Sequence, residues 1–176
     1  MVESVAENTS DAIVGALAWG AVAGPAGVAG YRAANTLDAM FGLRNERYAS
    51  FGWAAARLDD AMSWPAARLS AAITCAAAPL VGGRISQTAA VISRDGAAHP
   101  SPNAGRAEAA FAGALGVALG GPLVYGDRAE TRPQLGDGRP PGAQDIRRAT
   151  RLSAIVATAA ALLCATARDV KRRRRR

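Results

Sequence analysis

Apolar residues gather in a few long blocks along the chain, with polar and turn-forming segments between them. The longest block without a charge covers residues 12–30, which is just long enough to cross a hydrocarbon core of about 30 Å as a helix. Its glycines and Pro25 would weaken a helix in water, but small residues allow membrane helices to pack closely. This block predicts a membrane-spanning helix.

Three further apolar blocks are shorter or more interrupted. The block 70–83 contains Pro79 and predicts either a broken membrane helix or a buried one. The block 109–125 is rich in glycine and predicts a re-entrant or half helix, while 152–167 predicts a last apolar helix. No apolar–polar alternation is long enough to predict a strand. We therefore predict an all-α, multi-helix integral membrane protein with two to four membrane-embedded helices and polar interfacial loops.

The polar segments suggest where chemistry could take place. Residues 31–69 mix charged and aromatic side chains, which is typical of an interfacial or cytoplasmic helical segment. Residues 84–105 are polar and contain Pro100 and Pro102, which favour a loop. We expect segments 31–69 and 84–108 to build an active-site region on the cytoplasmic side of a single helical membrane domain, residues 1–170.

Charge is concentrated at the end of the chain. The 176 residues carry a net charge of +7, and the basic tail 171–176 supplies six of these charges, which leaves 7 − 6 = +1 for the body. Half of the residues are hydrophobic, and a basic block beside an apolar one favours contact with anionic membrane lipid. No basic surface interleaved with aromatic residues accompanies the tail, so we expect no nucleic acid partner.

Three acidic residues open the chain at a spacing of four. On a helix, Glu3, Glu7 and Asp11 form one stripe that leads into the apolar block. Carboxylates so close repel one another unless a cation such as Mg²⁺ or an arginine lies between them. The alternative is structural, because Ser4 and Glu7 fit a capping box at the start of a helix.

A second group of acids lies downstream. Asp59 and Asp60 follow Arg57, and Asn35 and Asp38 precede them. This group could bind a metal ion, or it could form ordinary solvated ion pairs with nearby arginines.

The only histidine, His99, excludes a site built from several histidines. A lone loop histidine is usually structural, but Ser101, Asn103 and Glu108 follow it closely and make acid–base chemistry an alternative. Lys171 is the only lysine, so a Walker-type phosphate loop is excluded. Any phosphate must be held by arginines, backbone amides and a carboxylate-bound metal.

Several strings resemble the signature blocks of the adenosylcobinamide-phosphate synthase family, and they occur in the same order over nearly the whole chain. They are ESVAENTSD at 3–11, NTLD at 35–38, ARLDD at 56–60, HPSPNAG at 99–105 and the block 108–121. The resemblance implies a multi-pass inner-membrane ligase of the vitamin B12 pathway. Such an enzyme uses ATP and Mg²⁺ to join adenosylcobyric acid to aminopropanol or its phosphate, and other enzymes of the corrinoid pathway are further candidate partners.

The resemblance supports these positions, and residue type suggests their roles. Metal or nucleotide binding is expected of Glu3, Glu7, Asp11, Asp38, Asp59 and Asp60. Phosphate or substrate binding is expected of Arg57, Arg68, Asn8, Asn35 and Tyr48. The catalytic candidates are His99, Ser101, Asn103 and Glu108.

In one respect the chain departs from the family pattern. The acidic block begins at the third residue, whereas in the family it follows a membrane-spanning N-terminal half. The resemblance therefore implies that the chain corresponds to the C-terminal half and could be an inactive fragment by itself. The alternative function is a non-enzymatic membrane scaffold for corrinoid-pathway enzymes.

Overall fold

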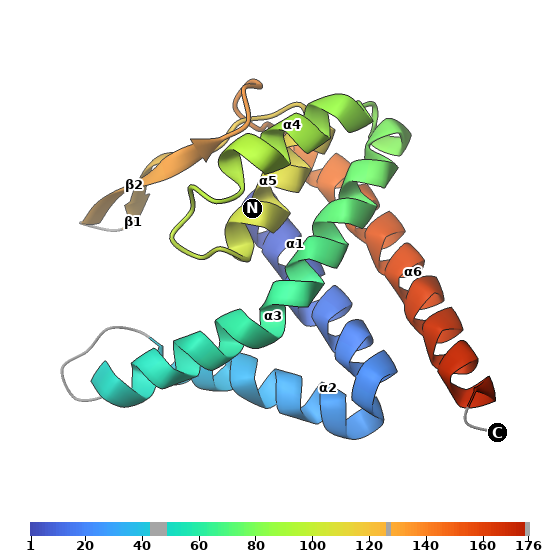
Figure 1. The fold of residues 1–176 in the computed structure, drawn as a ribbon. Helices are drawn as coiled ribbons and strands as arrows, with labels where there is room; N and C mark the ends of the chain where they lie inside the picture. The colour runs from blue at the N-terminus through green and yellow to red at the C-terminus, as the bar shows by residue number, and fades with distance from the viewer. Residues whose placement is uncertain (43–48, 126–127, 175–176) are drawn as a thin grey trace.

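Helices make up most of the protein (Figure 1). The computed structural model describes residues 1–42, 49–125 and 128–174. In chain order the elements are α1 (Val2–Asn8), the π-helix η1 (Thr9–Gly15), α2 (Ala16–Phe41), α3 (Ala49–Ala77), the 3-10 helix η3 (Ala78–Val81), α4 (Ile85–Asp95), α5 (Ala104–Leu115), β1 (Leu119–Tyr125), β2 (Arg128–Leu135) and α6 (Ala143–Arg173). The predicted helical character is confirmed, and the two strands correct the all-α prediction.

The first helical stretch runs from α1 through η1 into α2 and then turns sharply at Gly24 (Figure 1). Gly24 has φ 67° and ψ −150°, and Pro25 follows without an amide hydrogen to donate. Gly27 lies against the Trp19 carbonyl, where a side chain would clash, so glycine lets the chain fold back closely. The prediction of one uninterrupted spanning helix over 12–30 is therefore wrong at Gly24.

Helix α3 joins two segments that the sequence separates. It begins at Ala49 and continues to Ala77, so the apolar block 70–83 is mostly the end of a longer helix. Ser70, Ile73 and Thr74 are buried there, so the structure favours the buried helix over the broken membrane helix. The helix then tightens into η3, and Gly82 ends it in the left-handed conformation.

The segment 84–105, predicted as a loop, contains α4. Thr88, Val91 and Asp95 are buried at spacings of three and four, so one face of this helix packs inward, mainly against α5. Only residues 96–103 connect α4 to α5 without a helix.

The predicted half helix over 109–125 is also corrected. Helix α5 ends at Leu115 because Gly116 adopts a left-handed conformation with φ 67°. The chain then forms an antiparallel hairpin, in which Leu119 pairs with Leu135 and Gly121 pairs with Arg132. Gly120 and Gly121 both have positive φ, which a continuing helix could not accommodate.

The core lies where α1, α3, α5 and α6 meet. Phe111, Leu115, Leu135 and Leu152 are nearly or fully buried in it. Helix α6 is longer than the predicted 152–167 block because the flanking arginines continue it.

Two helical stretches, Val2–Phe41 and Ala143–Arg173, are long and apolar enough to cross a membrane. Within their most apolar windows only 17% and 28% of the residues are buried by the rest of the chain. Most of this apolar surface is therefore open, which is consistent with membrane association.

Candidate functional site

Charged residues from five segments line one hollow of about 410 Å³, which we call the polar pocket. It lies between α1 and η1, the second half of α2, α3, the loop before α5, and β2. Its lining residues are Glu7, Asn8, Asp11, Ala12, Arg32, Asn35, Asp38, Asp59, His99, Ser101, Ala104 and Arg132. The structure thus brings together eight of the predicted site residues, namely Glu7, Asn8, Asp11, Asn35, Asp38, Asp59, His99 and Ser101.

The π-helical segment and a buried tyrosine set the shape of this pocket. Gly15, at the end of η1, leaves the space that the Tyr31 ring occupies, since any side chain at Gly15 would overlap that ring. Tyr31 is fully buried, and its hydroxyl is hydrogen-bonded to Ser63 Oγ at 3.2 Å. These contacts hold the second half of α2 between η1 and α3, and π-helical turns are frequent at functional sites.

A chain of hydrogen bonds crosses from α2 to α3. Arg32 Nη1 donates to Asn35 Oδ1 at 3.3 Å, and Asn35 Nδ2 donates to Asp59 Oδ1 at 3.4 Å. Burial raises the pKa of Asp59, and the Asn35 amide opposes this shift by stabilising the ionised carboxylate. Asp38 raises the same pKa through charge repulsion, so this wall of the pocket would gain stability from a cation.

A carboxyl group lies next to the imidazole that lines the pocket. Glu108 on α5 is 1% exposed, and its Oε1 lies 3.8 Å from Nε2 of the lining residue His99. His99 Nδ1 lies 3.0 Å from the Ser101 N–H and 3.2 Å from the Ser101 carbonyl; with the N–H donating to Nδ1 in the shorter contact, the proton of the neutral ring lies on Nε2, facing Glu108. Nε2 and Oε1 are both buried, and neither has a hydrogen-bond partner among the described residues. Both atoms therefore keep unused hydrogen-bonding capacity next to the pocket.

Burial raises the pKa of Glu108 to about 8. The charge of Glu7, a hydrogen bond with Glu7 and the charge of Glu3 act in the same direction, while Arg132 opposes them. Glu108 therefore keeps its proton at neutral pH and exchanges it near pH 8, a value suited to general acid–base catalysis.

Glu3 serves a structural contact outside the pocket. Its Oε1 accepts a hydrogen bond from the Gly120 N–H at 2.7 Å, which ties α1 to β1. The capping-box alternative for Ser4 and Glu7 is wrong, because α1 begins at Val2 with Met1 as its N-cap.

Asn103 and Arg68 also lie outside the lining. Asn103 is 4% exposed, accepts a hydrogen bond from Arg68 Nη1 at 2.7 Å and donates one to the Asp60 carbonyl at 2.8 Å. Arg68 stacks on Trp64, with 4.3 Å between its Cζ and the ring centroid. These contacts hold the His99 loop against α3, so Asn103 and Arg68 position the site.

Of the remaining predicted residues, Arg57 lies away from the pocket. Arg57 is exposed, lies 4.0 Å from Asp60 and rests over the Trp53 ring, away from the pocket lining. Tyr48 falls outside the described residues.

Two cations of the site, Arg32 and Arg132, were not among the predicted site residues. Arg32 was recognised only as a possible ion-pair partner of the acids, although it precedes Asn35 by three residues and so shares its helix face. Arg132 could not be predicted, because it reaches the pocket on a strand that the sequence pattern did not predict.

Magnesium fits the pocket only together with a ligand that supplies further oxygens. Within residues 1–42, 49–125 and 128–174, no three His, Cys, Asp or Glu side chains are grouped so as to hold a metal ion by themselves. Asp11 Oδ1 is buried without a hydrogen-bond partner there, and Asp59 lies close enough to repel Asp11. Mg²⁺ commonly uses one or two carboxylates plus phosphate oxygens, and Asp11 with Asp59 meets that requirement.

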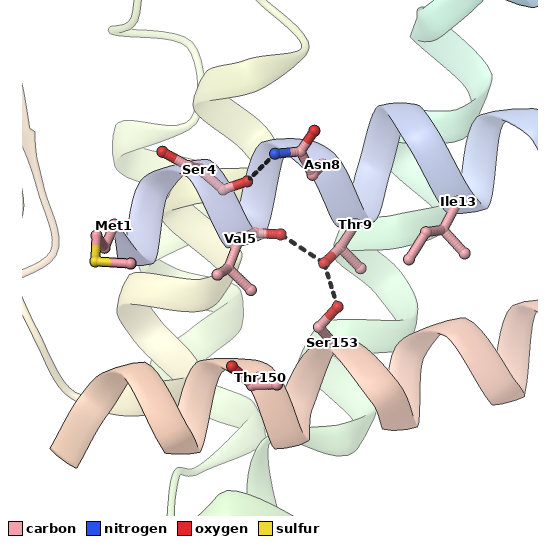
Figure 2. A pocket seen from close by; sticks show the side chains of 8 residues that line it. All are labelled: Met1, Ser4, Val5, Asn8, Thr9, Ile13, Thr150 and Ser153. Carbon is pink, nitrogen blue, oxygen red and sulfur yellow. Dashed lines mark hydrogen bonds between the residues drawn. The ribbon is translucent and has the colours of Figure 1, made fainter. Parts of the chain in front are cut away.

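A second hollow, of about 390 Å³, lies between α1 and α6 (Figure 2). Thr9 Oγ1 is hydrogen-bonded there to the Val5 carbonyl at 2.6 Å and to Ser153 Oγ at 2.7 Å. No charged side chain lines it, so it offers no group for phosphate or proton transfer.

Comparisons with known proteins place this site in a family. The family model described as CobD/Cbib protein matches residues 1–153. The chain is 53% identical over 162 residues to the cobalamin biosynthesis protein CobD of Mycobacterium tuberculosis, covering 92% of this chain and 52% of the relative. It is 48% identical over 152 residues to the protein of the same name from Rhodobacter capsulatus, covering 86% of this chain and 47% of the relative.

The chain thus spans about half the length of these curated relatives. No solved structure matches it. Because the family model covers most of the chain, including every residue that lines the polar pocket, the chain belongs to the CobD/CbiB family, which indicates a role in cobalamin biosynthesis.

Proposed function

We propose that this chain supplies the catalytic pocket of a membrane-bound, ATP-dependent carbon–nitrogen ligase, which joins aminopropanol or its phosphate to adenosylcobyric acid. Family membership supports the pathway. The observation that carries the reaction type is the buried Glu108 next to His99, which lines a pocket of acids and arginines. The chain spans about half the length of its curated relatives, so the complete activity is proposed for a protein of the relatives' length.

Amide formation requires a base. A free carboxylate is a poor electrophile, so ATP must first activate it, after which the amine nitrogen attacks the carbonyl carbon. The N–C bond forms, the activating group leaves with its electron pair, and the nitrogen must lose a proton. Ionised Glu108 accepts this proton, and His99 Nε2–H stabilises the ionised form.

Four other pocket residues would hold the phosphate groups of ATP and the Mg²⁺ bound to them. Arg32 and Arg132 would contact phosphate oxygens, and Asp11 and Asp59 would hold Mg²⁺ against them. Bound Mg²⁺ supplies charge neutralisation at the phosphate oxygens. Glu7 faces Glu108. Its role is to share the proton of Glu108 and to raise the affinity of Glu108 for that proton.

We also propose that the protein crosses the inner membrane several times. The open apolar surfaces of the two long helical stretches support this placement. The charged pocket lining favours an opening toward the cytoplasm, where ATP is present.

The test is the mass of the corrinoid formed by membranes that carry this chain, or a version extended to the length of its relatives. Each receives adenosylcobyric acid, aminopropanol phosphate and MgATP. We expect the amide product from the extended version at least, and its loss on Glu108→Gln. The exposed Arg57→Gln serves as the matched control and should retain activity. Full activity of the Glu108→Gln protein would remove Glu108 from the reaction, and the absence of product from both this chain and the extended version would favour the membrane-scaffold function.

A further inference from the structure

A second charged hollow lies at the C-terminal end of α6 and shares no lining residue with the polar pocket. This basic hollow measures about 610 Å³ and is lined by Ala21, Val22, Ala23, Gly24, Pro25, Arg168, Lys171 and Arg172. Figure 1 shows the bend of α2 and the end of α6 on the same side of the molecule. The hollow therefore combines small apolar residues with three cations.

The bend of α2 explains why the cations gather here. The break at Gly24 interrupts helical hydrogen bonding, so carbonyl groups of the preceding turn need other donors. Arg168 Nη1 donates to the Gly20 carbonyl at 2.8 Å, and Lys171 Nζ donates to the Val22 carbonyl at 3.0 Å. The first half of α2 and the helix α6 thus end close together, and the cations Arg168 and Lys171 lie between their ends.

The positive charge of the basic hollow is not neutralised by its neighbours. The nearest acid on α6, Asp169, is paired with Arg173 at 3.0 Å. The Arg172 side chain makes no hydrogen bond or ion pair within the described part of the chain. An anion that enters the basic hollow would therefore pair with a cation that has no ion-pair partner among the described residues.

Apolar side chains flank the cations. Val22 is 61% exposed, and Ala21, Ala23 and Pro25 line the same hollow beside the cations. A free phosphate or a nucleotide would leave this apolar surface in water. A molecule with an anionic head and hydrocarbon chains would cover both kinds of surface.

We propose that the basic hollow binds the phosphate headgroup of an anionic phospholipid, with its acyl chains along the exposed apolar surface at Val22. This site does not depend on the proposed ligase activity, but it rests on the proposed membrane placement. It would hold the bend of α2 and the end of α6 at the headgroup level of one leaflet, where anionic lipids attract basic residues.

The test uses the purified full chain in micelles that contain equal amounts of phosphatidylglycerol and phosphatidylcholine, with native mass spectrometry to count bound lipids. We expect preferential retention of phosphatidylglycerol. The double variant Arg168→Gln/Arg172→Gln should reduce that retention by roughly tenfold or more. Arg172→Gln alone should reduce it severalfold while leaving the Arg168 contact with Gly20 intact.

The matched control is Arg147→Gln/Arg151→Gln, which removes two exposed charges at the same spacing from the other end of α6. It should retain phosphatidylglycerol like the unmodified chain. Equal retention of the two lipids, or an equal loss in the control, would overturn the proposal. Displacement of the lipid by millimolar inorganic phosphate would also overturn it and indicate a site for free phosphate.

Discussion

Asp95 and Glu108 are buried carboxyl groups on neighbouring helices, yet their surroundings differ. Asp95 on α4 accepts two hydrogen bonds from the Arg94 guanidinium, at 2.6 and 2.7 Å, and a third from the Gly136 N–H at 2.8 Å. Glu108 on α5 faces Glu7, and its Oε1 has no hydrogen-bond partner among the described residues. Hydrogen bonds from Arg94 lower the pKa of Asp95, whereas burial raises that of Glu108.

This difference separates a structural carboxylate from the one that we propose to be reactive. A buried carboxylate with its hydrogen bonds complete stabilises the fold but has no free oxygen for a substrate. Asp145, held by Arg139, Arg148 and the Gly142 N–H, belongs to the same class as Asp95. Glu108 keeps one oxygen without a hydrogen bond, which lowers the stability of the fold. Buried carboxyl groups with such perturbed pKa values are common at catalytic sites.

The largest effect is expected from Glu108→Gln, which should lower product formation at least about a hundredfold at pH 8. It should also raise the unfolding temperature at pH 8 but not at pH 4. Because its folded-state pKa of about 8 lies above the ordinary value of 4.5, Glu108 costs stability as pH rises from about 4.5 to 8. Corrinoid mass and thermal unfolding at both pH values measure the two effects, and an unchanged rate would remove Glu108 from the reaction.

Asp95→Asn should have the opposite profile. We expect a loss of about 2 kcal/mol in the free energy of unfolding at pH 7, because hydrogen bonds to charged groups are broken. The lowered pKa of Asp95 means that its contribution exists above the ordinary pKa and disappears as pH falls through the folded-state value. Urea unfolding should show a smaller stability difference between the variant and the unmodified chain near pH 3 than at pH 7. The rate of product formation per folded molecule should stay unchanged. A specific rate loss would contradict the structural role.

Arg32→Gln should raise the KM for MgATP by about tenfold with a smaller change in kcat, since it removes a charge-assisted phosphate contact. Arg57→Gln removes the same charge from an exposed position near Asp60 and should leave KM unchanged. Equal KM values for the two variants would exclude Arg32 from phosphate binding.

The smallest effect concerns the pH dependence. With Glu108 as the base, the rate should rise with pH, with its midpoint near pH 8. His99→Ala removes the Nε2–H that stabilises ionised Glu108, so the midpoint should move upward by about one pH unit. A rate loss without this displacement would show that His99 supports the loop and does not tune the base.

Local patterns allowed part of the site to be predicted. Glu7 and Asp11 face the pocket because helical spacing places them on one side, and the loop with His99 was found from its dense polar residues. The hairpin and Arg132 could not be predicted, because strand β1 is rich in glycine and neither a strand-like alternation nor a recognised turn marks it in the sequence. The metal roles of the acids remain predictions, while Asn103 depends on a tertiary contact with Arg68 that spacing does not reveal.

The bend at Gly24 gives one residue control over the width of the polar pocket. Asp38 follows it by fourteen residues, which corresponds to an arm of about 21 Å. Rotating that arm by about ten degrees would move Asp38 by on the order of 4 Å, more than the length of a hydrogen bond. Two backbone dihedral angles remote from the pocket thus act as a hinge for the α2 wall, and a rigid bend is a condition for a formed site.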